Sequence, residues 1–312
     1  MILLVKSGGE AAVPEWQAIF REIAPHLDVR WFDDPDVDPA EVRYVLVWEP
    51  PPGRLAAMPN LRLICSSAAG VEHITADPSY PRHVPICRMG SDETAQRMGE
   101  YVAMACLMLL RDLKPALDAQ AARTWRNFDA PRTATETRVG IMGMGNLGLR
   151  SAIMLRGLGF PVAGWTRTPR AVPGVECFAG PEAQDAFVAR SDILVNLLPD
   201  TPATRGLIDA RTLARLPQGA GVVNAGRGPQ LVIADLIAAL DSGHLSGAVL
   251  DVFDTEPLRA DDPLWTHPKV IVTPHLASNA SRRARAQYVA DAIAAFERGD
   301  TPPNLYDSAR GY

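Results

Sequence analysis

The sequence predicts an α/β protein of two domains, one built on a doubly wound parallel sheet and the other on a smaller parallel sheet. Three observations support this class. The 312 residues are long for a single core and comfortable for two domains. Short apolar strand patterns alternate with helical patterns, which is typical of parallel sheets with helical crossovers. Near the middle of the chain, a glycine-rich turn lies between a strand pattern and a helix pattern.

Composition excludes several classes of function. Hydrophobic residues make up 47% and charged residues 21%, as in ordinary globular proteins. The net charge of −5 and the pI near 5.7 offer no basic surface for nucleic acid or an anionic membrane. Residues 1–5 lack the flanks of a signal peptide, and residues 102–110, the longest apolar run, are too few for a membrane span. We expect a cytoplasmic protein whose four separated cysteines are reduced, namely Cys65, Cys87, Cys106 and Cys177.

The first 90 residues predict the smaller domain. Residues 14–23 have a helical pattern with Pro14 at the start, a favoured position for proline. Strand patterns occupy residues 2–5, 29–32, 44–48, 61–67 and 84–88. This alternation predicts a small parallel α/β unit.

A long apolar helix is expected next, over residues 92–113. Asp92 can cap its start, and apolar residues cover most of its sides, so we expect it to be buried and to connect the domains. Residues 124–137 are polar and irregular, which predicts a loop. The helix and this loop are candidate contacts of a homodimer.

The glycine-rich turn opens the larger domain. Residues 138–142 have the pattern of a buried strand, and Gly143-Met-Gly145-Asn-Leu-Gly148 precedes a helical pattern, the context that the dinucleotide fingerprint of the Rossmann fold requires. Gly143 permits the tight turn, Gly145 lets the backbone approach a pyrophosphate, and Gly148 lets helix and strand pack closely. We expect the pyrophosphate of the dinucleotide to bind at the free N–H groups of the helix start. The residues expected to bind the dinucleotide here are Gly143, Gly145, Asn146, Leu147 and Gly148.

The alternation then continues to the end of the chain. Further strand patterns occupy residues 162–165, 193–197, 221–224, 247–251 and 270–273, and helical patterns occupy residues 181–189, 209–215, 232–241 and 278–298. Six strands with helical crossovers fit the two halves of a doubly wound sheet. The last helix is long enough to return to the first domain. We therefore expect a substrate domain of residues 1–91 and 282–312 and a dinucleotide-binding domain of residues 92–281.

The end of the second strand indicates which dinucleotide is bound. NAD-selective sites place an Asp or Glu about twenty residues past the glycines, but here the chain has Thr166-Arg-Thr-Pro-Arg170, without a carboxylate. Arginine forks suit a 2′-phosphate, so we expect NADPH rather than NADH, held by Thr166, Arg167, Thr168 and Arg170. The alternative is a solvated basic loop without a role in binding. A single arginine would have favoured that alternative, but this loop has two.

Three segments that follow strand patterns carry groups suited to chemistry. They are Asn224-Ala-Gly-Arg-Gly228, Asp251-Val-Phe-Asp-Thr-Glu-Pro257 and Thr273-Pro-His275. Ligands of α/β sheets bind beyond the carboxyl ends of the strands, where a guanidinium can hold a carboxylate. Taken singly, each residue has a structural alternative: Arg227 pairing with an acid, Glu256 in a solvated turn, His275 as a capping or core residue. Because all three residues occur in order after a nucleotide fingerprint, a functional role is favoured over these structural alternatives.

Together these segments resemble the signature segments of the D-isomer-specific 2-hydroxyacid dehydrogenases. The glycine turn and Leu197-Leu-Pro-Asp-Thr201 are similar to that family too, and the similarity covers essentially the whole chain. Residues 165–168, 281–297 and 309–312 are most similar to the glyoxylate/hydroxypyruvate reductase A branch. The resemblance implies a Rossmann coenzyme domain and a smaller flavodoxin-like substrate domain formed from both chain ends.

The resemblance also implies roles for individual residues. His275 is expected to give a proton to the keto oxygen, with Glu256 holding its ring and favouring the charged form. Arg227 is expected to bind the substrate carboxylate and polarise the carbonyl, and Asp251 to orient the nicotinamide carboxamide. Further cofactor contacts are expected from Leu198, Pro199, Ala225 and Gly226, and substrate contacts from Trp48, Ala69 and Gly70, with Arg88 as a weaker candidate.

The expected activity is NADPH-dependent reduction of a small 2-keto acid, glyoxylate or hydroxypyruvate, to the 2-hydroxy acid, without a metal. The family usually forms dimers through the coenzyme domain, so a homodimer is expected. Gly226 and Pro229 depart from the common pattern around the arginine. The alternatives are a phosphoglycerate- or formate-type specificity and a dinucleotide-sensing protein without catalysis. Formate enzymes typically have glutamine where this chain has Glu256, and phosphoglycerate enzymes often carry a further domain.

Overall fold

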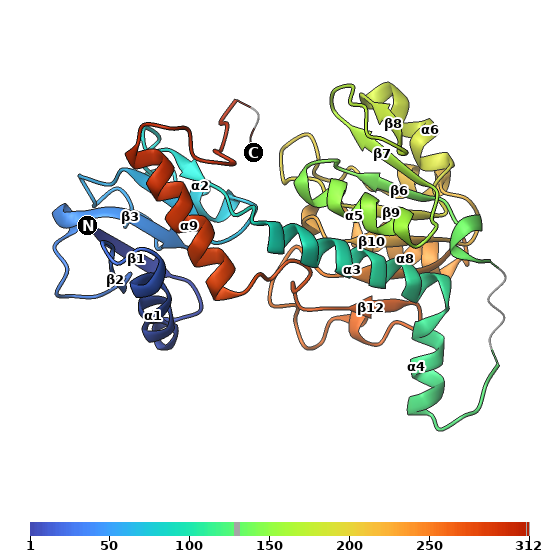
Figure 1. Ribbon diagram of the computed structural model, residues 1–312. Helices are drawn as coiled ribbons and strands as arrows, with labels where there is room; N and C mark the ends of the chain where they lie inside the picture. Colours follow the sequence, from blue (N-terminus) through green and yellow to red (C-terminus); the bar gives the residue numbers. More distant parts are fainter. Residues whose placement is uncertain (128–131, 310, 312) are drawn as a thin grey trace. The chain divides into compact units, whose positions relative to one another are not determined.

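The computed structural model describes residues 1–127, 132–309 and 311. The chain divides into two compact units, which we describe separately (Figure 1). The smaller unit comprises Met1–Thr94 and Ala280–Tyr312, and the larger unit comprises Ala95–Asn279.

The smaller unit is built on a parallel sheet, five-stranded in the described residues, with the order β2-β1-β3-β4-β5. Its strands are β1 (Ile2–Lys6), β2 (Asp28–Trp31), β3 (Val42–Val47), β4 (Leu63–Ser66) and β5 (Ile86–Cys87). This is the flavodoxin-like order, so the fold class expected for this unit is confirmed.

Both chain ends supply helices to one face of this smaller sheet. Figure 1 shows α1 (Val13–Ile23, blue) and α9 (Arg282–Glu297, red) side by side. Ser281 caps α9 by accepting a hydrogen bond from Ala284 N, and fully buried Trp16 packs in the core between these helices and the sheet. A second apolar cluster, which includes α2 (Glu72–Thr75), covers the opposite face.

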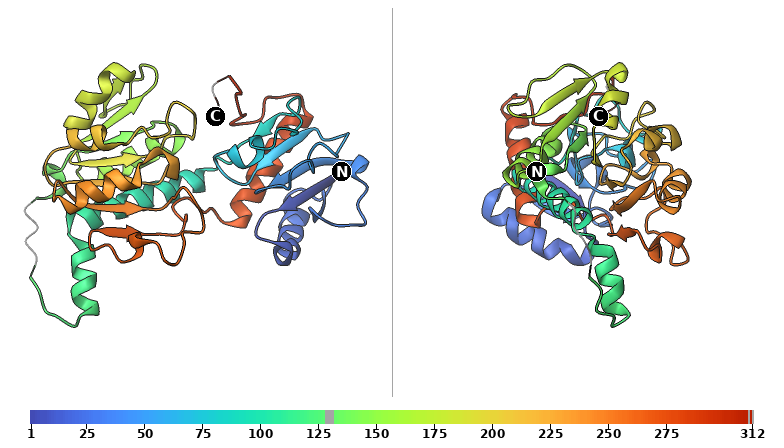
Figure 2. Two further views of the ribbon diagram at one scale, coloured as in Figure 1. Left: turned by 180° about the vertical axis from the view of Figure 1, so that it is seen from behind. Right: turned by 90° about the vertical axis from the view of Figure 1, so that its right-hand side faces the viewer.

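The larger unit is built on a parallel sheet, seven-stranded in the described residues, with the order β12-β11-β10-β9-β6-β7-β8 (Figure 2). Its strands are β6 (Val139–Met142), β7 (Val162–Thr166), β8 (Glu176–Ala179), β9 (Ile193–Asn196), β10 (Ala220–Asn224), β11 (Leu245–Leu250) and β12 (Val270–Val272). Helices α3 (Asp92–Leu110) and α5 (Asn146–Gly157) pack on one face. Helices α6 (Gln184–Ala189), α7 (Ala210–Arg215) and α8 (Ile233–Asp241) pack on the other. The doubly wound α/β class predicted from the sequence is confirmed.

One strand of the larger sheet was missing from the sequence prediction. The edge strand β8 (Glu176–Ala179) has no fully buried residue, so it lacks the apolar run by which the six predicted strands are recognised. An edge strand packs on one side only, which weakens its pattern.

The predicted helix over residues 92–113 is wrong in two respects. It ends at Leu110, and a second helix, α4 (Leu113–Ala121), starts after Asp112, whose positive φ of 49° breaks the helical path. Aspartate tolerates this left-handed conformation better than most residues. The helix is also not buried all round, because the side chains of Met104 and Leu107 are 38% and 37% exposed.

Two further expectations need adjustment. The last helix begins at Arg282, not at residue 278. The predicted loop over residues 124–137 contains a short 3₁₀ helix (Ala134–Glu136), and residues 128–131 of it lie outside the described residues, as do residues 310 and 312 of the terminal segment. Within the described chain, no helix combines the length and apolar character needed to cross a membrane.

Candidate active site

The glycine turn lies at the point where the strand order of the larger sheet reverses. The order runs outward from β6 and β9 in opposite directions, and the carboxyl ends at such a switch point form the usual ligand site of an α/β sheet. Gly143 follows β6 with φ of 96°, and a Cβ there would lie 2.8 Å from the carbonyl oxygen of Leu197, which follows β9. Glycine is therefore required for this turn to pass so close to its neighbour.

The other two glycines of the turn have the roles expected for dinucleotide binding. A Cβ on Gly148 would collide with the carbonyl of Gly143, so its absence lets α5 pack against the end of β6. A Cβ on Gly145 would meet nothing within 4 Å, and both Gly145 and Asn146, the first residue of α5, are exposed. A backbone that remains approachable at a helix start fits a pyrophosphate.

The loop after β7 brings one predicted arginine onto the glycine turn. Arg170 Nη1 donates to the carbonyl of Met144, in the middle of the turn, and the hydroxyl of Thr166 donates to the carbonyl of Thr168 at 2.7 Å. The side chains of Arg167, Thr168 and Arg170 are exposed. The loop therefore places cationic and hydroxyl groups beside the candidate pyrophosphate site.

Arg227 lies in a short loop after β10 that packs closely against the loop after β11. A Cβ on Gly228 would collide with the backbone of Phe253 and Asp254, so glycine is required for this contact. Arg227 is half-buried, and its Nη1 donates to the carbonyl of Gly226 at 2.8 Å. The predicted arginine and the predicted acidic segment are thus neighbours in the fold.

A cluster of three fully buried amide side chains holds the Arg227 loop. Asn196 Nδ2 donates to Asn224 Oδ1 at 2.9 Å and to Gln230 Oε1 at 2.6 Å. Gln230 Oε1 also accepts from Arg227 N at 2.9 Å, and Asn224 Nδ2 donates to the Arg227 carbonyl at 3.3 Å. Neither Asn196 nor Gln230 is predicted from the sequence as part of the site. Asn196, a polar amide at the end of the apolar strand β9, carries a usable signal, whereas Gln230 lies beyond the end of β10 and does not.

His275 and Glu256 form a direct pair. His275 Nδ1 lies 2.7 Å from Glu256 Oε2, and the side chains are 35% and 33% exposed. The other oxygen, Glu256 Oε1, accepts from Phe253 N at 2.9 Å, which fixes the carboxylate. The ring is therefore oriented through Nδ1, and Nε2 is the nitrogen suited to exchange a proton with a ligand.

Asp251 holds the backbone on both sides of His275. Asp251 is 1% exposed, and its Oδ1 accepts from the Thr273 hydroxyl at 2.6 Å and from Leu276 N at 3.0 Å, while Oδ2 accepts from Ala277 N at 2.9 Å. The Asp251 carbonyl accepts from His275 N at 2.9 Å. His275 has φ of 49°, an unfavourable value for histidine that these bonds maintain.

Tyr101 of α3 extends this network, a role that its place in an apolar helix pattern does not predict. Its hydroxyl lies 2.7 Å from Thr273 Oγ1, and because the threonine donates to Asp251, the tyrosine is the donor to threonine. Burial raises the pKa of Tyr101 well above its ordinary value, so the hydroxyl keeps its proton.

The substrate residues predicted in the smaller unit follow neighbouring strands. Trp48 follows β3, and Ala69 and Gly70 lie in the loop after β4. Ser66 Oγ is 2.9 Å from the Ala68 carbonyl and 2.8 Å from the Gly70 carbonyl, so this hydroxyl fixes the loop. The ring of Trp48 packs against His73, with centroids 4.4 Å apart. Arg88, the weaker candidate, follows β5 and donates from its backbone N to the Asn304 carbonyl at 3.1 Å.

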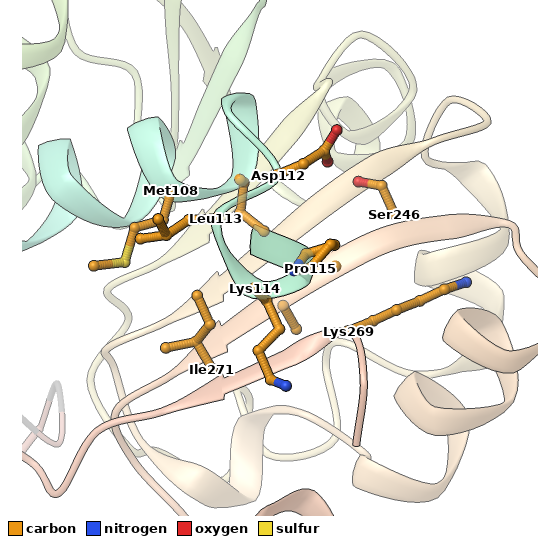
Figure 3. Close-up of a pocket in the computed structure, with 11 residues that line it drawn as sticks. Met108, Asp112, Leu113, Lys114, Pro115, Ser246, Lys269 and Ile271 are labelled. Carbon is orange, nitrogen blue, oxygen red and sulfur yellow. The ribbon is translucent and has the colours of Figure 1, made fainter. Parts of the chain in front are cut away.

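A small pocket at the opposite edge of the larger sheet has no histidine or arginine among the described residues that line it (Figure 3). It lies between the α3–α4 junction and residues of β11 and β12. Its two lysines are engaged elsewhere, Lys114 with the Asp118 carboxylate and Lys269 with the carbonyl of Leu240. Within the described residues, no group of three or more His, Cys, Asp or Glu side chains could hold a metal ion. The carboxyl edge remains the candidate active site of this unit.

Comparison with protein families identifies a matching family model. Residues 103–277 match the model described as "D-isomer specific 2-hydroxyacid dehydrogenase, NAD binding domain". The chain is 37% identical over 303 residues to a glyoxylate/hydroxypyruvate reductase A of Serratia proteamaculans, covering 96% of each chain. It is 38% identical over 304 residues to the protein of the same name from Salmonella paratyphi B, covering 95% of this chain and 96% of the relative.

Solved structures with the same two-unit fold are also similar. A D-isomer specific 2-hydroxyacid dehydrogenase from Xanthobacter autotrophicus, in complex with NADPH and MES, is 43% identical with a TM-score of 0.93. An NADPH-dependent glyoxylate/hydroxypyruvate reductase from Sinorhizobium meliloti, in complex with NADP and sulfate, is 37% identical with a TM-score of 0.91. Each comparison covers 100% of this chain and 99% of the other.

Proposed function

The chain belongs to the D-isomer specific 2-hydroxyacid dehydrogenase family, and from this premise we propose that it reduces glyoxylate or hydroxypyruvate with NADPH. The named relatives support the reaction and the coenzyme. The observation that carries the proposal is the His275–Glu256 pair, 2.7 Å apart, on the same sheet edge as Arg227 and the glycine turn. An acid, a carboxylate-binding cation and a dinucleotide turn are the parts that such a reduction needs.

The residues of the glycine turn fit the coenzyme. The open space at Gly145 and the free N–H groups at the start of α5, Asn146 and Leu147, would hold the pyrophosphate. Leu198, Pro199, Ala225 and Gly226 line the ends of β9 and β10 beside this turn. When bound, NADPH supplies a hydride from nicotinamide C4 to the carbonyl carbon.

The protein's own groups complete the reduction. Arg227 binds the substrate carboxylate and polarises the carbonyl, a preorganised electrostatic role. His275, protonated on both nitrogens, donates the Nε2 proton to the carbonyl oxygen as the carbon gains the hydride, and Glu256 stabilises the resulting positive ring through Nδ1. Asp251 keeps His275 in position and is the proposed partner of the nicotinamide carboxamide. Ala69, Gly70 and Trp48 of the smaller unit are the proposed substrate contacts.

Selectivity for NADPH is assigned to the loop after β7. Arg167 and Arg170 supply cations, and Thr166 and Thr168 supply hydroxyls, where NAD-selective enzymes have an acid. Arg170 already contacts Met144 of the glycine turn, and this contact supports a role for its guanidinium at the ribose 2′-phosphate.

A homodimer in the cytoplasm, without a nucleic-acid partner, is part of the proposal. Large apolar side chains are exposed on α3, α4 and the following segment: Met104 (38%), Leu107 (37%), Leu117 (45%) and Trp125 (96%). Apolar clusters of this kind mark protein contacts. Cys65, like the other three cysteines, is unpaired, as is usual in a reducing compartment. We expect sedimentation at the mass of a dimer, and dissociation when Leu117 and Trp125 are both changed to glutamate.

The activity is tested with a panel of 2-keto acids and both coenzymes. We expect turnover of glyoxylate and hydroxypyruvate with NADPH, and much weaker use of NADH and of larger keto acids. Tight NADPH binding without turnover of any keto acid would contradict an enzyme and favour a dinucleotide sensor.

A further inference from the structure

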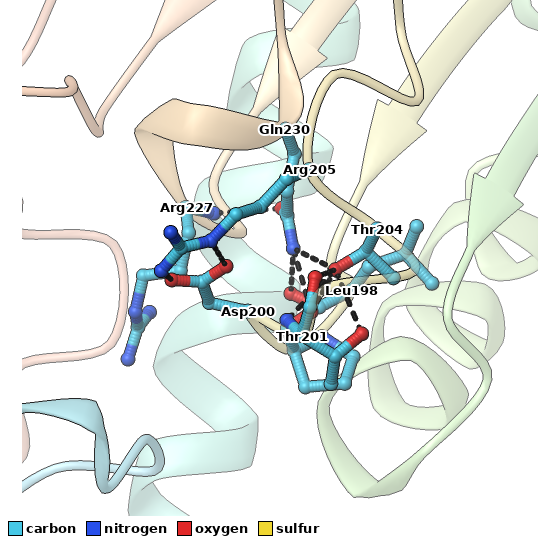
Figure 4. Close-up of polar contacts among 8 residues, drawn as sticks. Leu198, Asp200, Thr201, Thr204, Arg205, Arg227 and Gln230 are labelled. Atoms are coloured by element: carbon cyan, nitrogen blue, oxygen red, sulfur yellow. Dashed lines mark hydrogen bonds and ion pairs between the residues drawn. The ribbon is translucent and has the colours of Figure 1, made fainter. Parts of the chain in front are cut away.

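Both the oxygen and the nitrogen of the Gln230 side-chain amide form hydrogen bonds inside the larger unit. The side chain is fully buried. Its Oε1 accepts from Arg227 N at 2.9 Å and from Asn196 Nδ2 at 2.6 Å, and its Nε2 donates to the carbonyls of Leu198 at 3.0 Å and Pro199 at 2.7 Å. Figure 4 shows this amide between the Arg227 loop and the turn after β9. A buried amide with every hydrogen-bonding position engaged is rigid.

The acceptor half of this amide controls the backbone of Arg227. The carboxamide oxygen and the bond from Asn224 to the Arg227 carbonyl hold both sides of the residue. Room for the oxygen exists because residue 226 is glycine: a Cβ on Gly226 would lie 2.6 Å from Gln230 Oε1. Gly226 and Gln230 are therefore complementary.

The donor half controls the turn after β9. Leu198 and Pro199 follow the strand that lies beside β6 at the switch point, and Leu197 contacts the position of a Gly143 Cβ. The Thr204 hydroxyl donates to the same Pro199 carbonyl at 2.7 Å. This turn therefore forms the wall next to the dinucleotide-binding glycines.

We propose that Gln230 is a positioning residue that fixes Arg227 relative to the coenzyme-binding turn Leu198–Pro199. The inference rests on the proposed function. One rigid amide joins the loop that binds the substrate carboxylate to the wall of the coenzyme site, so the distance between the keto group and the hydride donor depends on it. A misplacement of about 1 Å at such a site costs about 10²-fold in rate.

The test is Gln230→Met, which keeps the approximate volume of the side chain and removes the hydrogen bonds of the amide. For glyoxylate reduction we expect kcat/KM to fall by about 10²-fold, with a higher KM. We also expect weaker binding of oxamate, a non-reducible keto acid analogue, to the protein–NADPH complex in calorimetry. NADPH affinity should change by less than about threefold, because the glycine turn and the loop after β7 are intact and the Thr204 hydroxyl still holds the Pro199 carbonyl.

Gln218→Met is the matched control. The Gln218 amide also donates to a backbone carbonyl, that of Gly243 at 2.7 Å, but it is exposed and lies before β10, at the opposite edge of the sheet. Its kinetics should equal those of the unmodified protein. Should Gln230→Met fail to fold, Gln230→Glu replaces it, keeping an acceptor for Arg227 N and losing the donors; a smaller loss of oxamate affinity is then expected.

A double-mutant cycle separates positioning from general stabilisation. If Gln230 acts through Arg227, adding Gln230→Met to Arg227→Ala should change kcat/KM by less than about threefold, because the residue to be positioned is gone. Additive losses, or unchanged oxamate affinity in the folded Gln230 variants, would overturn the inference. Failure of the unmodified protein to reduce any keto acid would instead overturn the proposed function.

Discussion

The carboxyl and amino edges of the larger sheet differ in the partners of their buried polar side chains. At the carboxyl edge, Asn224, Gln230 and Asp251 are buried, and their side chains bond to the backbone of the loops that carry Arg227 and His275. At the amino edge, Asp192 is 6% exposed and accepts from Arg138 N at 2.8 Å and from the Arg138 and Arg132 guanidinium groups at 2.9–3.2 Å.

This difference separates positioning from simple stabilisation. The carboxyl-edge bonds fix loops whose functional side chains remain half-exposed, and they use mostly neutral amides. The amino-edge bonds fix the starts of β6 and β9, and they depend on a charge. Substitutions at the carboxyl edge should therefore alter catalysis, and substitutions at the amino edge should alter the free energy of unfolding.

The largest expected effect is that of His275→Ala at the carboxyl edge. Loss of the proton donor should lower kcat for glyoxylate by about 10²–10⁴-fold, while NADPH affinity, measured by fluorescence titration, stays nearly unchanged. Full activity in this variant would remove His275 from the mechanism.

The next effect concerns coenzyme choice at the same edge. Arg167→Asp combined with Arg170→Ala removes two cations expected to contact the 2′-phosphate, so the Kd of NADPH should rise by about 10²-fold. The Kd of NADH should change little. Equal losses for both coenzymes would show that this loop does not distinguish them.

Tyr101→Phe tests how far the positioning network extends into α3. The variant loses the hydrogen bond to Thr273, worth about 1 kcal/mol, so we expect kcat to fall roughly fivefold with an unchanged Kd for NADPH. A loss of thermal stability with no change in kcat would assign Tyr101 to the fold alone.

The smallest effect on activity is expected for Asp192→Asn at the amino edge. Burial of Asp192 opposes its ionisation, but hydrogen bonds from Arg138 outweigh this and hold the pKa of Asp192 below its ordinary value. A lowered folded-state pKa stabilises the protein above the unfolded-state pKa, and this contribution is lost as pH falls through the folded-state value.

Urea unfolding at several pH values tests this prediction. At neutral pH, Asp192→Asn should lower the free energy of unfolding by about 2 kcal/mol, and the difference from the unmodified protein should shrink as the pH falls below about 4. The kcat/KM for glyoxylate should be unaffected. A constant difference across this range would show that the Asp192 charge is not the cause.

The sequence predicts the fold class because buried parallel strands give continuous apolar runs, and the glycine turn lies where strand and helix patterns meet. It fails at β8, an edge strand without a fully buried residue, and at Asp112, where a single left-handed residue divides a continuous apolar pattern. A local conformation of that kind leaves almost no trace in hydrophobic periodicity.

The site residues show the same limit. Arg227, Glu256 and His275 are found because each follows an apolar strand in a recognisable segment. Gln230 and Tyr101 act through contacts between segments far apart in sequence, and nothing in their local patterns specifies these partners. The assigned catalytic roles stay predictions that the variants above can test.

The Asp251 carboxylate gives the segment after His275 an uncommon combination of properties. Leu276 is 43% exposed, yet its amide hydrogen, like that of Ala277, is bonded to a carboxylate that is 1% exposed. Hydrogen–deuterium exchange at these two amides should therefore be as slow as in the sheet interior. Many side chains could replace leucine here during evolution, but proline, which has no amide hydrogen, could not.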